Sequence, residues 1–219
     1  MASYSSEEEN YARLNLLLAG ISSRAVRKLF DSQFPPVSLA ASLMKENNKL
    51  RELKKKNTIN QAQWYLLFPP VRNVVGSKTF DISLMITLLS NLANLSPPHG
   101  GLPPVTDTTQ GADLGRFKYY RNYLAHLDDE KVISTVFDTA WDKIAGAIER
   151  LGGPQMKQEC DHLKSKALDQ TNQQIMMDIK HSRDEITELK KSVNTLALNS
   201  VEIKEMMDDI VPRNIRGIN

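Results

Sequence analysis

Residues 111–127 have the sequence GADLGRFKYYRNYLAHL, and this stretch decides which fold the chain adopts. Its large side chains recur every three or four residues, at Leu114, Phe117, Tyr120 or Arg121, and Leu124. This spacing is typical of the buried face of an α-helix. Lys118, Asn122 and His126 are four residues apart and therefore share a second face of the same helix. The stretch predicts an amphipathic helix with a basic, an amide and an imidazole side chain along one line.

Helical periodicity continues on both sides of this stretch. Further helices are predicted over residues 7–20, over a short segment ending at residue 30, and over residues 38–53, 59–68, 82–95 and 134–151. Candidate N-caps mark their starts: the capping-box pair Ser6 and Glu9, Ser22 or Ser23, Thr58 and Asp81. Residues 96–109 hold four Pro and two Gly and predict an irregular loop. No stretch shows sustained β-strand alternation, so the predicted fold class is all-α.

The composition excludes several classes of function. A net charge of +2 gives no overall attraction to nucleic acid, membranes or acidic substrates, so such binding needs a local patch. Cys160 is the only cysteine, which excludes an intramolecular disulfide and favours a reducing compartment; a cytoplasmic location is expected. The chain has no Gly-rich phosphate loop, metal-ligand cluster or apolar run long enough to span a bilayer. Neither a metal, a cofactor nor a membrane is therefore predicted.

Three successive lysines, residues 54–56, follow the helix predicted over residues 38–53. A run of like charges is usually the solvated end of a helix. Contact with nucleic acid is the alternative, and the residues alone leave both open.

A different periodicity begins after Pro154. Apolar residues occupy the a and d positions of one heptad register at Leu168, Ile175, Ile179, Ile186, Leu189, Val193, Leu196, Ile203, Met207 and Ile210. A narrow apolar seam between charged and amide residues is typical of a coiled coil. The predicted organisation is a helical domain over residues 1–153, an oligomerising coiled coil over residues 154–211, and a tail or linker over residues 212–219. The alternative is one long helix that folds back against the domain.

Four segments, together with the order of elements, resemble the HEPN superfamily, in the subfamily found in the DAZ-interacting zinc-finger E3 ligase. They are QWYLLFPP (63–70), FDISLMITLLSNLANLSPP (80–98), DLGRFKYYRNYLAHL (113–127) and FDTAWDKIAGAIERLGG (137–153). The resemblance covers roughly residues 11–153. It implies an up-and-down helical bundle that pairs with a second copy, so that two Arg-to-His motifs face each other. Many HEPN proteins are metal-independent endoribonucleases, and others bind RNA or partners without cutting.

The resemblance assigns roles to residues of this chain. The family's motif falls on Arg121, Asn122 and His126 as candidate catalytic residues, and Lys118 and Arg116 are candidate RNA contacts. An arginine stabilises phosphorane charge and a histidine titrates near neutral pH, so these residue types suit RNA cleavage. A structural role is the alternative: Arg121 would pair with an acidic residue, Asn122 would contact a loop, and His126 would end its helix.

The last twelve residues, DDIVPRNIRGIN (208–219), resemble the connector before a P-loop NTPase domain in STAND-type immune proteins. This implies an N-terminal module of a larger, intracellular immune-type assembly. Two functions remain open: an endoribonuclease with a composite dimeric site, acting on single-stranded RNA, and a non-catalytic oligomerisation, RNA-binding or protein-binding module of a multidomain sensor or ubiquitin ligase-like protein. In both, the chain is expected to form at least a dimer through the HEPN face and the coiled coil.

The heptad pattern leads to a test of assembly. We expect the chain to be a dimer or larger oligomer in light scattering. Replacing Leu189 and Leu196 with Asp should separate the coiled-coil helices, because two unpaired charges would be buried in the seam. A wild-type monomer at tens of micromolar would contradict the coiled-coil prediction.

Overall fold

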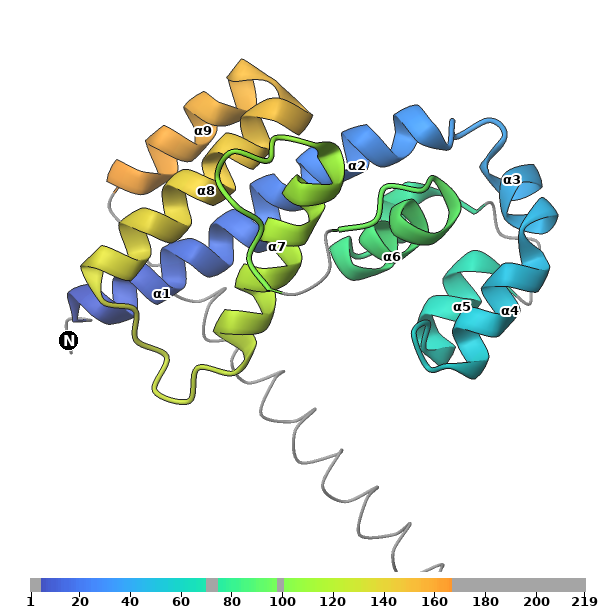
Figure 1. Cartoon of the computed structure of the whole chain (residues 1–219), viewed down its shortest axis with the longest axis horizontal. Helices are drawn as coiled ribbons and strands as arrows, with labels where there is room; N and C mark the ends of the chain where they lie inside the picture. The colour runs from blue at the N-terminus through green and yellow to red at the C-terminus, as the bar shows by residue number, and fades with distance from the viewer. Residues whose placement is uncertain (1–4, 70–74, 98–100, 167–219) are drawn as a thin grey trace, which may run out of the picture. The chain divides into compact units, whose positions relative to one another are not determined.

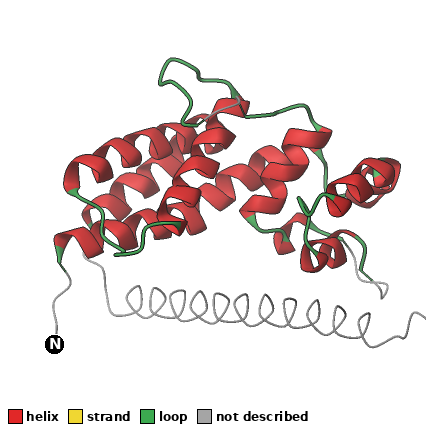
Figure 2. Ribbon diagram, turned by 60° about the horizontal axis from the view of Figure 1, so that its bottom comes forward, coloured by secondary structure: helices red, strands yellow, loops and turns green. Residues whose placement is uncertain are grey.

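The computed structural model describes residues 5–69, 75–97 and 101–166, and every regular element within these ranges is a helix (Figures 1 and 2). The predicted all-α class is confirmed for this part of the chain. The heptad positions from 168 to 210 and the connector-like segment 208–219 lie outside the described residues.

The N-terminal helix is longer than predicted. It runs through α1 (Ser6–Leu16), a π-helical turn η1 (Leu17–Ile21) and α2 (Ser22–Gln33) without a break. Its capping box starts one residue before the predicted pair: the Ser5 hydroxyl accepts the Glu8 N–H, and the Glu8 carboxylate accepts the Ser5 N–H. The prediction that Ser22 or Ser23 caps a separate helix is wrong. Ser22 has helical backbone angles and is buried, and the π turn carries the helix past it.

Three short helices follow, α3 (Leu39–Lys45), α4 (Asn47–Lys55) and α5 (Gln61–Leu67) (Figure 1). The N-cap of α5 is Asn60 rather than the predicted Thr58. The Asn60 side chain accepts the Gln63 N–H at 2.8 Å, and the Gln63 side chain accepts the Asn60 N–H at 3.1 Å. Between α4 and the cap, Asn57 takes a left-handed conformation (φ 54°) and Ile59 turns into the core. Both residues belong to the turn that delays the helix start.

The predicted apolar helix is α6 (Ile82–Leu92), preceded by the 3₁₀ turn η2 (Ser77–Thr79). Asp81 caps α6 as predicted, with its carboxylate accepting the Leu84 N–H at 2.6 Å. Six of the eleven α6 residues are buried: Ile82, Leu84, Met85, Ile86, Leu88 and Leu89. The predicted helix over residues 111–127 is α7 (Gln110–Ala125), and Leu114, Phe117, Tyr120 and Leu124 are all buried.

The helix α8 (Ser134–Gly152) lies at the centre of the core. It packs against α1, α2, α7 and α9 (Pro154–Ser165), as the neighbouring ribbons in Figure 1 show. Its buried side chains are Phe137, Ala140, Trp141, Ile144, Ala145, Ala147 and Ile148. Trp141 is 1% exposed, and its ring lies 5.2 Å from that of Phe137. A helix that packs against several others needs a broad apolar face, which explains this set of buried residues.

Two glycines let the loop before α7 approach the helix. A Cβ on Gly111 would lie 2.6 Å from the backbone oxygen of Ser96. A Cβ on Gly115 would lie 3.0 Å from Pro103 Cγ and 3.2 Å from Pro97 Cβ. Glycine inside a helix costs about 1 kcal/mol relative to alanine. Here it permits a contact between helix and loop that a larger residue would block.

The segment after Pro154 begins as part of this helical packing. Gly153 (φ 98°) ends α8, and Pro154 occupies the first turn of α9. Cys160 of α9 is fully buried, and Arg13 Nη1 donates to the backbone oxygens of Leu163 (2.8 Å) and Lys166 (2.6 Å). Residues 154–165 therefore pack against the core helices.

The buried thiol gives a test of this packing. Burial raises the pKa of the Cys160 thiol to about 11, from 9.0. At pH 8 the folded protein should react with a disulfide reagent about 100-fold more slowly than an exposed thiol, because the thiolate is the reactive form. The matched control is Gln158→Cys in a Cys160→Ala background, which places the thiol at an exposed position of the same helix. Equal rates for both proteins would show that α9 does not stay packed.

Candidate functional site

The three motif residues lie at the C-terminal end of α7. His126 is the C-cap, and its backbone N–H donates to the carbonyl oxygens of Asn122 and Tyr123, each at 3.2 Å. Lys118, Asn122 and His126 are exposed, which places the polar line predicted from the sequence on the solvent side. The side chains of Asn122 and His126 make no hydrogen bond or ion pair with any described residue. Both are therefore accessible to a ligand or a second chain.

Arg121 is held differently from its two motif partners. It is only partly exposed, and Nη1 donates to the hydroxyl of Ser83 on α6. Burial lowers the pKa of the Arg121 guanidinium, and the charge of Asp81 opposes this shift. An arginine stays ionised in spite of such a shift. Among the described residues it forms no ion pair, so the suggested pairing with an acidic residue is replaced by a neutral hydroxyl.

Ser83 was not among the predicted site residues. It lies on the first turn of α6, two residues after the N-cap Asp81. The Asp81 carboxylate also accepts a hydrogen bond from Gln63 Nε2 of α5, at 3.4 Å. A polar connection therefore runs from Arg121 through the start of α6 to α5. The capping Asp81 and the serine two residues after it were visible in the sequence, but the proximity of Ser83 to Arg121 depends on how α6 and α7 pack.

The arrangement can support acid–base chemistry. An exposed imidazole can give or take a proton in general acid–base catalysis. His126 is the C-cap of the 16-residue helix α7. On the same helix, the Arg121 guanidinium supplies hydrogen-bond donors for an anion. The same position at a helix end is also what the structural alternative for His126 requires.

Arg116, the other expected RNA contact, is buried. Its side chain is 1% exposed, and Nη1 donates to Asp113 Oδ1 at 2.7 Å. Nη2 donates to the backbone oxygens of Pro104 and Asp107, both at 2.6 Å. With its donors engaged inside the protein, Arg116 is a structural residue, and we correct the expectation that it contacts RNA. A basic residue three positions after an aspartate was the only sequence signal for this pairing.

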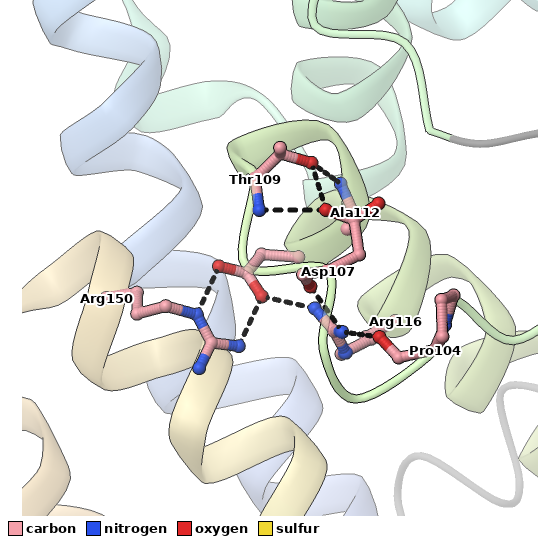
Figure 3. A network of polar contacts seen from close by, with 7 residues as sticks. Pro104, Asp107, Thr109, Ala112, Arg116 and Arg150 are labelled. Carbon is pink, nitrogen blue, oxygen red and sulfur yellow. Dashed lines mark hydrogen bonds and ion pairs between the residues drawn. The ribbon is translucent and has the colours of Figure 1, made fainter.

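Asp113 joins two arginines from different helices, Arg116 of α7 and Arg150 of α8. Figure 3 shows this network of polar contacts, with both arginines labelled. Its carboxylate is fully buried and also accepts hydrogen bonds from Arg150 of α8, from Nε at 2.9 Å and from Nη2 at 2.5 Å. The hydrogen bond to Asp113 raises the pKa of the Arg150 guanidinium. Asp107 in turn accepts both the N–H and the hydroxyl of Thr109, the N-cap of α7. The loop before α7, α7 itself and α8 therefore meet at one buried carboxylate.

The described ranges hold neither a metal-ion cluster nor a membrane-spanning helix. No group of three or more His, Cys, Asp or Glu side chains there could hold a metal ion. No helix in the same part of the chain is both long enough and apolar enough to cross a bilayer.

The buried carboxylate leads to a stability test. Asp113→Asn should lower the free energy of unfolding by roughly 3–5 kcal/mol, because the Arg116 cation would stay buried without its counter-charge. The measurement is urea unfolding followed by circular dichroism. Asp128→Asn, at an exposed position without a side-chain partner among the described residues, is the matched control and should change little. Similar unfolding midpoints for the two variants would contradict a structural role for Asp113.

Comparison with known proteins places most of the chain in one family. Residues 36–176 match the family described as DZIP3/hRUL138-like HEPN. Human E3 ubiquitin-protein ligase DZIP3 is 28% identical over 151 residues, which cover 66% of this chain and 12% of that protein. The mouse protein of the same name is 30% identical over 141 residues, which cover 61% of this chain and 12% of that protein. No solved structure matches the chain.

The range matched by the family differs from the range of resemblance seen in the sequence. It begins later than the range of resemblance, 11–153, and extends beyond residue 153. The chain spans only 12% of the length of the curated relatives. The matched residues nevertheless make up more than half of the 219 residues. The chain belongs to the DZIP3/hRUL138-like HEPN family.

Proposed function

We propose that this chain is an RNA-directed HEPN module that cleaves single-stranded RNA without a metal, through a site assembled from two copies. The single observation that carries the proposal is the exposure of two polar motif side chains at the C-terminal end of α7. There, Asn122 and His126 are exposed, and their side chains have no hydrogen-bond or ion-pair partner among the described residues; Arg121 precedes them on the same helix. Membership of the HEPN family supports the same conclusion.

The proposed reaction is an internal transesterification. The 2′-hydroxyl loses its proton to a base and attacks the adjacent phosphorus, while the bond to the 5′-oxygen breaks and that oxygen takes a proton from an acid. The products are a 2′,3′-cyclic phosphate and a 5′-hydroxyl. One neutral imidazole suits the base and one imidazolium suits the acid. Arg121 would stabilise the negative charge that builds up on the non-bridging oxygens.

The need for both a base and an acid is the reason for invoking two copies. Each chain offers one His126, and the described residues hold no second histidine on the same helix face. Two facing α7 helices would supply an imidazole and an imidazolium at once. Asn122, one turn before His126, would orient the imidazole or contact phosphate, and exposed Lys118 would contact phosphate one turn earlier.

A second function is favoured by a different observation. His126 ends α7 and Arg121 is anchored to Ser83, so both have a structural explanation. In this alternative the module oligomerises, or binds RNA or protein, within a multidomain protein, and does not cut. The relatives that carry a similar segment are named as E3 ubiquitin-protein ligases, which is compatible with such a module.

The deciding experiment is RNA cleavage in EDTA by the purified chain. Wild type should produce 2′,3′-cyclic phosphate ends, and His126→Ala and Arg121→Ala should each lose on the order of 10² or more in rate. EDTA removes the contribution of contaminating metal-dependent nucleases. Circular dichroism should be unchanged in both variants.

His162→Ala is the matched control, since His162 is an exposed histidine on α9, and it should cut as fast as wild type. Mixing His126→Ala with Arg121→Ala should not restore a site that needs both residues from both chains. Absence of metal-free cleavage by wild type, or unchanged rates in the alanine variants, would favour the non-catalytic module. Loss of helicity in His126→Ala would assign His126 a helix-ending role.

A further inference from the structure

The charge of the chain is concentrated in one short segment. Residues 45–56, which end α3 and form α4, contain six basic and two acidic side chains, a net charge of +4, against +2 for the whole chain. Lys45, Lys49, Arg51, Lys55 and Lys56 are all exposed. Among them only Lys55 forms an ion pair with a described residue, Glu52, at 2.7 Å. The surface of α4 is therefore a local basic patch on a nearly neutral protein.

The Trp64 ring lies beside this basic segment, and Tyr65 and Phe68 follow it along the chain. Lys54 Nζ lies 4.7 Å from the centre of the Trp64 ring, which joins α4 to α5. The Trp64 and Phe68 rings are 4.6 Å apart, and Tyr65 is 52% exposed. A solvated helix end would account for the lysines but leaves an exposed tyrosine unexplained. Cations for phosphates next to an aromatic face for bases are the combination that binds single-stranded nucleic acid.

The same helix α5 is connected to the candidate site. Gln63 precedes Trp64 and Tyr65 and donates to Asp81, which stands two residues before Ser83, the partner of Arg121. The aromatic part of α5 and the Arg121 guanidinium are thus joined through the first turn of α6. One strand of RNA could follow this direction from α7 to α4.

We infer that α4 and α5 form an extended binding surface for the backbone and bases of the single-stranded RNA that reaches the α7 site. This surface is named here the α4–α5 surface and consists of Lys49, Arg51, Lys55, Lys56 and Tyr65. The inference rests on the proposed function in taking RNA as the ligand. Lysines and the arginine neutralise phosphates, and Tyr65 offers a ring on which a base stacks without sequence preference.

The test measures binding rather than cleavage. Fluorescence anisotropy with a fluorescein-labelled oligouridylate is recorded over a range of salt concentrations, with the full chain carrying His126→Ala so that the RNA stays intact. Adding Lys49→Glu and Lys56→Glu should weaken binding about tenfold. The slope of the logarithm of the binding constant against the logarithm of the salt concentration should become shallower by roughly 1.4, since each of the two lost phosphate contacts contributes about 0.7. Tyr65→Ala should weaken binding roughly fivefold or more, and Tyr65→Phe should bind as wild type.

The control variant carries Lys143→Glu and Lys166→Glu, which change the net charge equally but lie on α8 and after α9. It should keep the affinity and the salt slope of the parent. Equal weakening in both double variants would overturn the α4–α5 surface, as would a parent protein that binds phosphatidylserine vesicles but no oligouridylate. If the chain binds RNA through this surface but never cuts it, the proposed catalysis is contradicted and the α4–α5 surface is not.

Discussion

The position of α7 depends on one buried carboxylate. Asp113 is fully buried and binds Arg116 of its own helix and Arg150 of α8, while Arg116 also holds the loop through two backbone oxygens. Removing a charge from water is costly, and only an arrangement that satisfies it with several charge-assisted hydrogen bonds is stable. The network therefore permits only one relative position of the loop, α7 and α8. Because an α-helix rises about 1.5 Å per residue, fixing Asp113 also fixes His126, about 20 Å along the same helix.

Three arginines of α7 and α8 have different roles because their environments differ. Arg116 and Arg150 share the Asp113 carboxylate, so their charges are compensated within the protein. Arg121 has a neutral hydroxyl as its partner, and the nearest acidic influence is the longer-range charge of Asp81. Its positive charge is therefore the less compensated one and remains able to attract an anion. Residue type alone does not separate these roles.

The first turn of α6 joins two parts of the surface that are far apart in sequence. Asp81 caps α6 and accepts Gln63 from α5, and Ser83 accepts Arg121 from α7. A helix N-terminus has backbone N–H groups without partners, so a capping aspartate is expected there in any case. Its position also links α5 to α7 through the first turn of α6, by the hydrogen bonds of Gln63 and Arg121.

The sequence by itself determined the all-α class, the buried face of α7, the Asp81 cap and the family, because helical periodicity and capping are local properties that neighbouring residues specify. It misplaced the cap of α5 and divided the first helix in two, since several residues near each boundary were suitable caps. Only the tertiary structure decided that Arg116 is buried while Lys118 is exposed, and that Arg121 binds Ser83. These outcomes depend on groups brought together from distant segments, and no local pattern records which buried cation will meet which carboxylate.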